Sequence, residues 1–271
     1  MDRRKFLQTI AVGTAVLHIP GLRAAERRLS DESIKDYLFR IRNPDLHHGG
    51  DAVINGQVKA TLTSVNNRIM NVRRVVGFGN FNVLSFDDML KYARRYSRIG
   101  EFSAGELALI ESIFYEDASR YGFYGEKPLS DITQRIDRRE VVKIPRTGHF
   151  LFAGEPQELY KKVRKQIGGN ITLTSGVRSV VKQMQLFISK ADRSDGNLSL
   201  ASRSLAPPGY SFHGVGDFDV GIAGWGARNF TDDFATTDEF KRLLDLGYID
   251  IRYPEDNRLG VRFEPWHIKV G

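Results

Sequence analysis

Two short stretches that combine histidine with acidic residues constrain this chain more than any other feature of its sequence. The first is Ser211–Asp219, in which His213 is followed by Asp217 and Asp219, and the second is Glu264–His267. A catalytic Zn²⁺ site usually takes three protein ligands from His, Asp or Glu side chains and keeps one position for water. Two histidines and one carboxylate would fill these positions, and a further acid could move a proton. The two stretches therefore predict a catalytic metal site, and the fold has to bring them together.

The composition limits the donor atoms that such a site can use. The 271-residue chain has no cysteine, which excludes disulfides, thiolate ligands and cysteine nucleophiles. A metal would have to bind imidazole nitrogens and oxygen atoms. The six histidines are His18, His47, His48, His149, His213 and His267. The pair at 47 and 48 lies in a predicted loop with no acid or third histidine following at ligand spacing, so we expect two exposed loop residues, with metal binding as the alternative. His149 stands alone beside apolar residues, so we expect it to be structural, with a place at the site as the alternative.

The charge balance argues against a nucleic-acid partner. The formal net charge is +7, of which residues 1–25 contribute +3. The remaining charge is mild and spread out, and no compact Lys/Arg run with interleaved aromatic residues occurs. A mildly basic protein suits an anionic environment such as a cell wall.

The first 25 residues have the pattern of an export signal. The run Arg3–Leu7 contains paired arginines before Phe-Leu, and Ile10–Leu17 is a short apolar run. This pattern resembles a twin-arginine export signal, and the apolar run is too short to span a bilayer comfortably. We expect residues 1–25 to direct the protein to the periplasm or otherwise out of the cytoplasm, with cleavage near Ala24 or Ala25. An uncleaved anchor and an ordinary amphipathic helix are the alternatives, and no other stretch is apolar enough for a membrane span.

Residues 26–145 are predicted to form a mainly helical accessory region. Apolar residues recur at helical spacing over residues 85–124. Ser103 and Glu106 have the spacing of a capping box, which starts a helix by satisfying two backbone N–H groups. Residues 52–75 contain short β-branched runs separated by Gly and Asn, which favours a hairpin. Because no catalytic constellation occurs in this region, we expect it to wall one side of a substrate groove.

From about residue 146 the pattern changes to helices mixed with strands. Helices are predicted after Pro156, Ser179 and Thr236, and strands over residues 171–174, 217–222, 248–253 and 261–270. The last two strands are expected to pair through a turn at residues 257–260. Because long crossover helices between these strands are lacking, we predict an α+β fold, an antiparallel sheet with flanking helices that carries the zinc site. The predicted domains are residues 1–25, 26–145 and 146–271.

Three motifs follow one another in this α+β region. They are Ser-Gly-Val-Arg-Ser at residues 175–179, Ser211-x-His213-x-x-Gly216, and Glu264-Pro265-Trp266-His267. In this order they resemble the VanY-type zinc D-alanyl-D-alanine carboxypeptidases, whose fold is shared with lysostaphin-like peptidases and the hedgehog signalling domain. The resemblance covers about residues 150–271 and leaves residues 26–145 uncovered.

The resemblance implies a Zn²⁺ ion held by two histidines and an aspartate. His213 and His267 match the histidines. The family pattern places its aspartate seven residues after the first histidine, where this chain has Val220. Asp219 and Asp217 lie on one face of the predicted strand, so periodicity does not choose between them. We expect Asp219 to be the third ligand because it leads into the strand as the family's aspartate does, and Asp217 is the alternative.

The resemblance implies roles for further residues. Glu264 matches the general base, and Arg178 matches an arginine that faces the substrate carbonyl or carboxylate. Ser211 matches a serine near the terminal carboxylate, and Gln183 matches a polar position on the following helix. A carboxylate can accept a proton from water, and a guanidinium that stays charged can hold an anion, so the set is chemically coherent. Trp266 is expected to pack the site and exclude water, with substrate contact as the alternative.

The resemblance thus implies an exported zinc-dependent peptidase that hydrolyses the terminal D-Ala–D-Ala bond of peptidoglycan stem peptides. A D,D- or L,D-endopeptidase that cuts peptidoglycan cross-links is a close alternative, which substrate truncation would distinguish. A non-catalytic, metal-stabilised module that binds the cell wall is another, since fold does not fix function. The oligomeric state is left open.

Overall fold

The structure, a computed structural model, describes residues 31–247 and 249–270. The predicted export signal therefore lies outside the described residues. The chain divides into two compact units, Met1–Lys35 and Asp36–Gly271, and everything below concerns the second. Helix α2, Asp31–Arg42, runs across this division. In the described ranges no helix combines the length and apolar character that crossing a membrane requires.

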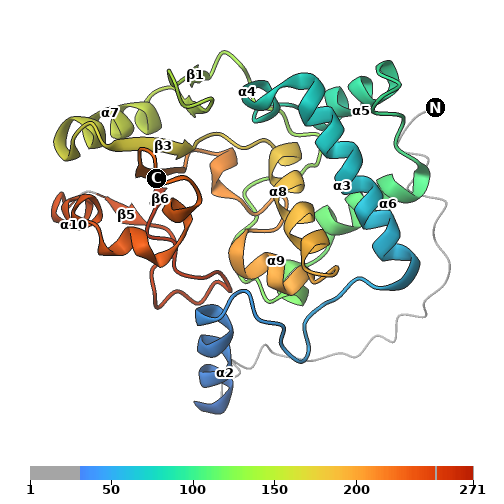
Figure 1. Ribbon diagram of the computed structural model, residues 1–271, viewed down its shortest axis with the longest axis horizontal. Coiled ribbons are helices and arrows are strands. Elements are labelled where there is room, and N and C mark those ends of the chain that lie inside the picture. Colours follow the sequence, from blue (N-terminus) through green and yellow to red (C-terminus); the bar gives the residue numbers. More distant parts are fainter. Residues whose placement is uncertain (1–30, 248, 271) are drawn as a thin grey trace, which may run out of the picture. The chain divides into compact units, whose positions relative to one another are not determined.

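One hydrophobic core is built mainly by helices (Figure 1). Its elements are α3 (Gly56–Val76), α4 (Phe78–Phe81), α5 (Phe86–Arg95), α6 (Ala104–Tyr115), the 3₁₀ helix η1 (Ala118–Tyr121), α8 (Val180–Arg193) and α9 (Leu198–Ser204). Helix α3 lies against α6 and α8. Phe114 of α6 and Phe187 of α8 are fully buried in this core. The core therefore draws on residues from both sides of position 146, and the domain boundary placed there stays a prediction.

The hairpin expected over residues 52–75 is wrong, because most of this segment belongs to helix α3. Leu62, Val65, Ile69 and Val72 are all fully buried, and their spacing of three, four and three residues places them on one helical face. Valine and isoleucine have low intrinsic helix propensity, but tertiary context routinely overrides such preferences. Packing of this face against α6 and α8 is the context that decides here.

The capping box predicted at the start of a helix is confirmed at α6. The Ser103 hydroxyl accepts a hydrogen bond from the Glu106 backbone N–H, and the Glu106 carboxylate accepts one from the Ser103 N–H. The same carboxylate pairs with Arg68 of α3 at 3.1 Å. The local signal in the sequence thus also connects two helices of the core.

A second core is built on a four-stranded antiparallel sheet with strand order β3 (Ile171–Ser175), β4 (Phe218–Ile222), β6 (His267–Lys269), β5 (Asp250–Ile251). Apolar residues of α7 (Glu155–Ile167) and α10 (Asp238–Asp245) pack on it (Figure 1). Smaller elements are the β1–β2 pair (Val141–Lys143 and Phe150–Phe152) and the 3₁₀ helices η2 (Phe212–Gly214), η3 (Gly226–Phe230) and η4 (Asp232–Thr236). The predicted α+β class is confirmed. Strands β5 and β6 pair as expected but are shorter than predicted.

Side-chain alternation gives this sheet an apolar face and a polar face. Phe218 and Ile268 are fully buried in the second core. In the sheet register Asp219 stands opposite His267, and Ser175 stands opposite Asp219. Because directly opposed residues share a face, these three polar side chains lie next to one another on adjacent strands. The polar face is where the candidate site is built.

Candidate metal and catalytic site

The structure brings together the three residues that the sequence analysis named as metal ligands. His213, Asp219 and His267 each offer one ligand atom, and these atoms lie within 4.8 Å of one another. All three residues are buried, with exposed fractions of 0%, 1% and 4%. No other group of this kind occurs among the described residues. The cluster is contributed by η2, β4 and β6, which meet only in the folded chain.

His213 is oriented by the backbone. Its Nδ1 donates to the carbonyl of Gly176 at 2.8 Å, which leaves the Nε2 lone pair facing the cluster. Nε2 lies 3.2 Å from Asp219 Oδ1, and both atoms are buried without a hydrogen-bond partner. Since buried polar atoms are nearly always satisfied, two adjacent orphaned acceptors indicate a cation site. Burial, reinforced by the charge of Arg178, lowers the pKa of His213 to about 4, so the ring is in its neutral, ligating form at pH 7.

His267 lies between two aspartates. Its Nε2 bonds to Asp217 Oδ2 at 2.9 Å, while its Nδ1 lies 3.5 Å from Asp219 Oδ1 and 3.3 Å from Glu264 Oε2. Burial disfavours a charge on this ring, but the bonds to Asp217 and Glu264 outweigh burial and raise the pKa of His267 to about 9. Asp217 thus forms a hydrogen bond with Nε2 of His267, and this bond orients Nδ1 of the same ring toward the cluster.

The two candidate aspartates have different surroundings. Asp217 accepts hydrogen bonds from the Arg252 guanidinium, from the Val270 backbone N–H at 2.9 Å and from His267. Burial raises the pKa of Asp217, but the bonds to His267 and Arg252 outweigh it and lower the value to about 2. Asp219, by contrast, keeps Oδ1 without a partner. This difference favours Asp219 as the ligand and Asp217 as the acid that orients a ligating imidazole.

Arg178 reaches the polar face from the segment between β3 and α8. Its Nη2 donates to Asp219 Oδ2 at 2.5 Å and its Nε donates to Ser175 Oγ at 2.8 Å. Its backbone N–H donates to the carbonyl of His213 at 3.1 Å. Gly176 permits the close approach of this segment to β2, because a Cβ atom there would lie 2.0 Å from a β2 carbonyl oxygen. The guanidinium is therefore fixed beside the cluster.

Glu264 lies at the edge of the cluster. Its side chain is 11% exposed, so water can reach the carboxylate that faces His267. Its backbone N–H donates to the carbonyl of Tyr253 at 3.0 Å, and the Tyr253 ring stands edge-on to His267 at 5.1 Å. Glu264 thus has the position that a proton acceptor beside a metal site needs.

The remaining predicted site residues are more enclosed. Ser211 is 4% exposed and immediately precedes η2. Gln183 donates from Nε2 to the carbonyl of Ala206 at 2.6 Å, while its buried Oε1 has no partner. Trp266 is 2% exposed, and its ring stands edge-on to Phe230 at 5.9 Å in the sheet core. This placement fits the packing role that the sequence analysis favoured for the tryptophan.

Two residues near the cluster had no signal in the sequence. Arg252 holds Asp217 and lies over the Phe212 ring at 3.7 Å. Asn82, which is 1% exposed, accepts a hydrogen bond at its backbone carbonyl from the Ser179 N–H at 2.8 Å. Both contacts join segments far apart in the chain, so no local spacing could have marked them.

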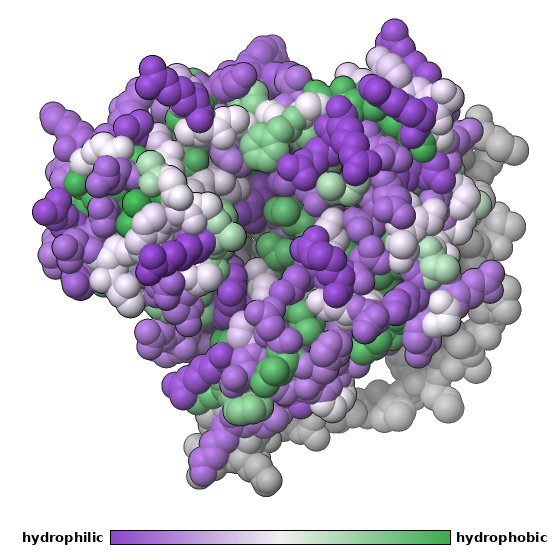
Figure 2. Space-filling view, viewed as in Figure 1, coloured by the Kyte–Doolittle hydropathy of each residue, from purple (hydrophilic) through white to green (hydrophobic). Residues whose placement is uncertain are grey.

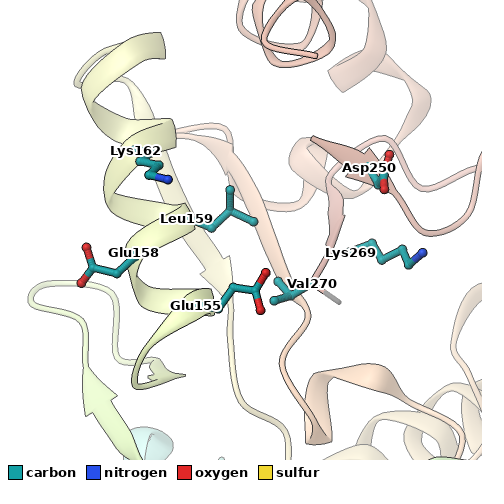
Figure 3. A pocket seen from close by; sticks show the side chains of 7 residues that line it. All are labelled: Glu155, Glu158, Leu159, Lys162, Asp250, Lys269 and Val270. Atoms are coloured by element: carbon teal, nitrogen blue, oxygen red, sulfur yellow. The ribbon is translucent and has the colours of Figure 1, made fainter. Parts of the chain in front are cut away.

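Figure 2 shows a hollow in the surface between the part of the molecule that contains α7 and α10 and the part that contains α3 and α8. A separate pocket lies between α7 and the β5–β6 edge, lined by Glu155, Glu158, Leu159, Lys162, Asp250, Lys269 and Val270 (Figure 3). Figure 3 shows Glu155 directed from α7 toward Val270. None of the clustered histidines and aspartates lines this pocket, so it is distinct from the candidate site.

Three solved structures resemble part of the fold. The LdcB LD-carboxypeptidase is 20% identical with a TM-score of 0.40, over 49% of this chain and 69% of that chain. A mutant of the vancomycin-resistance D,D-pentapeptidase VanY in complex with Zn(II) is 21% identical with a TM-score of 0.36, over 48% and 77%. VanYB in complex with D-alanine-D-alanine is 21% identical with a TM-score of 0.37, over 48% and 76%.

No curated protein matches the chain. Residues 152–270 match the model of the VanY family, described as D-alanyl-D-alanine carboxypeptidase. This range contains all three motifs, so the resemblance to the VanY-type carboxypeptidases is confirmed for residues 152–270.

Proposed function

We propose that the protein is a zinc-dependent peptidase that releases the terminal D-alanine from peptidoglycan stem peptides ending in D-Ala-D-Ala. The observation that carries the proposal is the pair of buried, unpartnered acceptors, His213 Nε2 and Asp219 Oδ1, with His267 Nδ1 beside them. Two histidines and one carboxylate form a ligand set that Zn²⁺ accepts in hydrolases. The family match over residues 152–270 supports the reaction class.

The residues around the cluster divide the chemistry between them. Zn²⁺ bound by the cluster would lower the pKa of water to about 7 and polarise the scissile carbonyl. Glu264, 3.3 Å from His267, would accept a proton from the attacking water and deliver it to the leaving amine. Arg178 stays charged and would stabilise the carbonyl oxygen as negative charge develops, or hold a substrate carboxylate.

We retain Ser211 and Gln183 as candidates for substrate contact. The Gln183 Nε2 donates to the backbone carbonyl of Ala206, whereas the Gln183 Oε1 is free to accept a hydrogen bond. Gln183 would therefore suit a substrate N–H better than a carboxylate. Ser211 can donate to a carboxylate oxygen through its hydroxyl.

A peptidoglycan substrate would require export, and the run Arg3–Leu7 is the feature that supports it. We propose that residues 1–25 direct twin-arginine export. Replacing the paired arginines with lysines should keep the protein in the cytoplasm, as measured by cell fractionation. Export that persists in this variant would contradict the proposal.

The test of the catalytic proposal is D-alanine release from a pentapeptide ending in D-Ala-D-Ala. Chelation should abolish release and added Zn²⁺ should restore it. Glu264→Gln should lower the rate about 10²–10⁴-fold, the usual contribution of an acid–base group, without loss of bound zinc. Glu155→Gln, in the separate pocket, is the matched control and should behave as wild type.

Each contrary result points to a different conclusion. Release that survives chelation would reject the metal-dependent mechanism. No release by a zinc-loaded protein would direct the assay to cross-linked muropeptides, the substrate of an endopeptidase. No turnover of either substrate would favour a module that only binds the wall.

A further inference from the structure

A buried cation lies close to the candidate site without an acid to balance it. Lys182, in the first turn of α8, is 6% exposed. Its Nζ donates one hydrogen bond, at 3.0 Å, to the neutral side chain of Gln185. Within the described part of the chain it forms no ion pair, and the charged groups that act on it, Arg178 and Arg73, are both positive. Burying an ammonium without a counter-ion is costly, so a negatively charged ligand beside Lys182 would stabilise its charged form.

The surroundings of Lys182 suit an anion. Burial and the charges of Arg178 and Arg73 lower the pKa of Lys182 to about 7, and a bound anion would favour its charged form. The first turn of α8 contains no acidic residue, so the positive end of the helix dipole is not neutralised there. Phe78 of α4, 42% exposed, places its ring 5.9 Å from the Lys182 Nζ. This ring forms an apolar wall beside the buried ammonium.

The same surroundings adjoin the catalytic residues. His149 stands edge-on to Phe78 at 5.2 Å and faces the side-chain nitrogen of Asn82 at 3.4 Å. Burial, with the charges of Arg178 and Lys182, lowers the pKa of His149 to about 4, and Asp219 and His213 also act on it. Asn82 Oδ1 is buried without a partner. Lys182 and two residues of the metal cluster, Asp219 and His213, thus lie within electrostatic range of the same histidine.

We propose that Lys182, next to Arg178, binds a carboxylate of the peptide substrate in a subsite walled by Phe78 and His149. The proposal rests on the proposed function and extends it, because it gives the helical region a part in substrate recognition. The carboxylate has two sources, the C-terminus of the peptide or an acidic side chain upstream of the scissile bond. In both cases the bond formed is a charge-assisted hydrogen bond from the ammonium.

The test measures peptide binding in a zinc-loaded Glu264→Gln background, so that peptides stay intact. Three pentapeptides ending in D-Ala-D-Ala are compared. The first has lysine at the third position, and the second has diaminopimelate, the carboxylated counterpart of lysine, at that position. The third is the diaminopimelate peptide with a C-terminal amide in place of the carboxylate. Adding Lys182→Met should raise the Kd about tenfold or more for peptides that carry the recognised carboxylate, as measured by calorimetry. Lys190→Met, on the same helix and paired with Asp45 at 2.5 Å, is the matched control and should leave every Kd unchanged.

The pattern across the three peptides identifies the source. A loss of affinity confined to the two diaminopimelate peptides supports recognition of the side-chain carboxylate. A loss for both free acids but not for the amide supports recognition of the terminal carboxylate. An unchanged Kd for all three peptides, or the same loss for all three, would overturn the proposal. Because binding is scored without turnover, absence of D-alanine release from wild type would refute the proposed function and leave the subsite to be judged separately.

Thermal unfolding separates this role from a purely structural one. Removal of a buried ammonium that has no counter-ion should leave the Tm of the peptide-free Lys182→Met variant equal to or above that of its parent. A lysine that mattered only for folding would give a lower Tm. A lower Tm together with equal loss of affinity for all peptides would therefore also refute the subsite.

Discussion

The helical core and the sheet core use similar apolar residues, but they leave different surfaces. Helix α3 packs against α6 and α8, and Phe187 is enclosed on all sides. The sheet buries one face against α7 and α10 and keeps Asp219 and His267 on the other. Helix α8 belongs to the first core by packing, yet Arg178 just before it bonds to the polar face of the sheet. The candidate site thus forms where the polar face of the sheet meets the start of a helix that is anchored elsewhere.

The largest effect should come from testing whether the two cores unfold together. Phe187→Ala in the helical core and Phe218→Ala in the sheet core each remove a fully buried ring, and each should cost about 3–5 kcal/mol of unfolding free energy. If the cores depend on each other, both variants will show one transition in urea, with the same midpoint by near- and far-ultraviolet circular dichroism. Tyr124→Ala, at a 59% exposed position, is the control and should change little. Two separate transitions in either variant would show that the cores are independent.

A second test uses His149, which contacts Asn82 of the helical region and follows β1. The folded protein holds the pKa of His149 at about 4, whereas the unfolded chain has an ordinary histidine. The unfolded state therefore binds more protons between about pH 6.5 and pH 4, so the free energy of unfolding should fall by up to about 3 kcal/mol as the pH is lowered through this window. Above about pH 6.5, His149 is neutral in both states, so it does not lower the free energy of unfolding. His149→Gln should flatten this part of the pH dependence, measured by urea unfolding with chelator present; equal slopes in both proteins would contradict the assignment.

The comparison can be sharpened within the sheet itself. Asp217→Asn should raise the Kd for Zn²⁺ about 10–100-fold, because Asp217 orients His267 without being a ligand. Asp219→Asn should weaken binding further, since the ligand atom itself is changed. Competition with a chromophoric chelator measures both, and Asp250→Asn on β5 is the control. If Asp217→Asn lowered the affinity for Zn²⁺ more than Asp219→Asn did, the assignment of the third ligand would be reversed.

The smallest expected effect is confined to the helical region. Ser103→Ala removes the cap of α6 and should cost about 1 kcal/mol of stability. Zinc affinity and D-alanine release should not change, because the cap touches no residue of the candidate site. Ser97→Ala at an exposed position is the matched control for denaturant unfolding. A change in zinc affinity of Ser103→Ala would show tighter coupling between the regions than their contacts suggest.

Local patterns in the sequence were enough for much of the fold. The Ser103–Glu106 cap, the helix after Pro156 and the strand beginning at Ile171 are all present. These features depend on neighbours a few residues apart, which the sequence displays directly. The hairpin prediction for residues 52–75 was wrong because the β-branched residues of this segment are held in a helix by packing against α6 and α8. The motifs also named the three residues that cluster, since residue type and order are sequence properties.

The choice between Asp217 and Asp219 shows what the sequence could not decide. A strand has a period of two, so the pattern alone predicts both acids on one face of a strand, whereas β4 begins only at Phe218 and leaves Asp217 just before it. Only the pairing of β4 with β6 sets Asp219 opposite His267, and only the end of β5 brings Arg252 to Asp217. The same holds for Lys182, which is buried beside Phe78 although the two residues are far apart in the sequence. Residue chemistry was determined by the sequence, whereas the partner of each charge was decided by long-range register and packing, which no local pattern encodes.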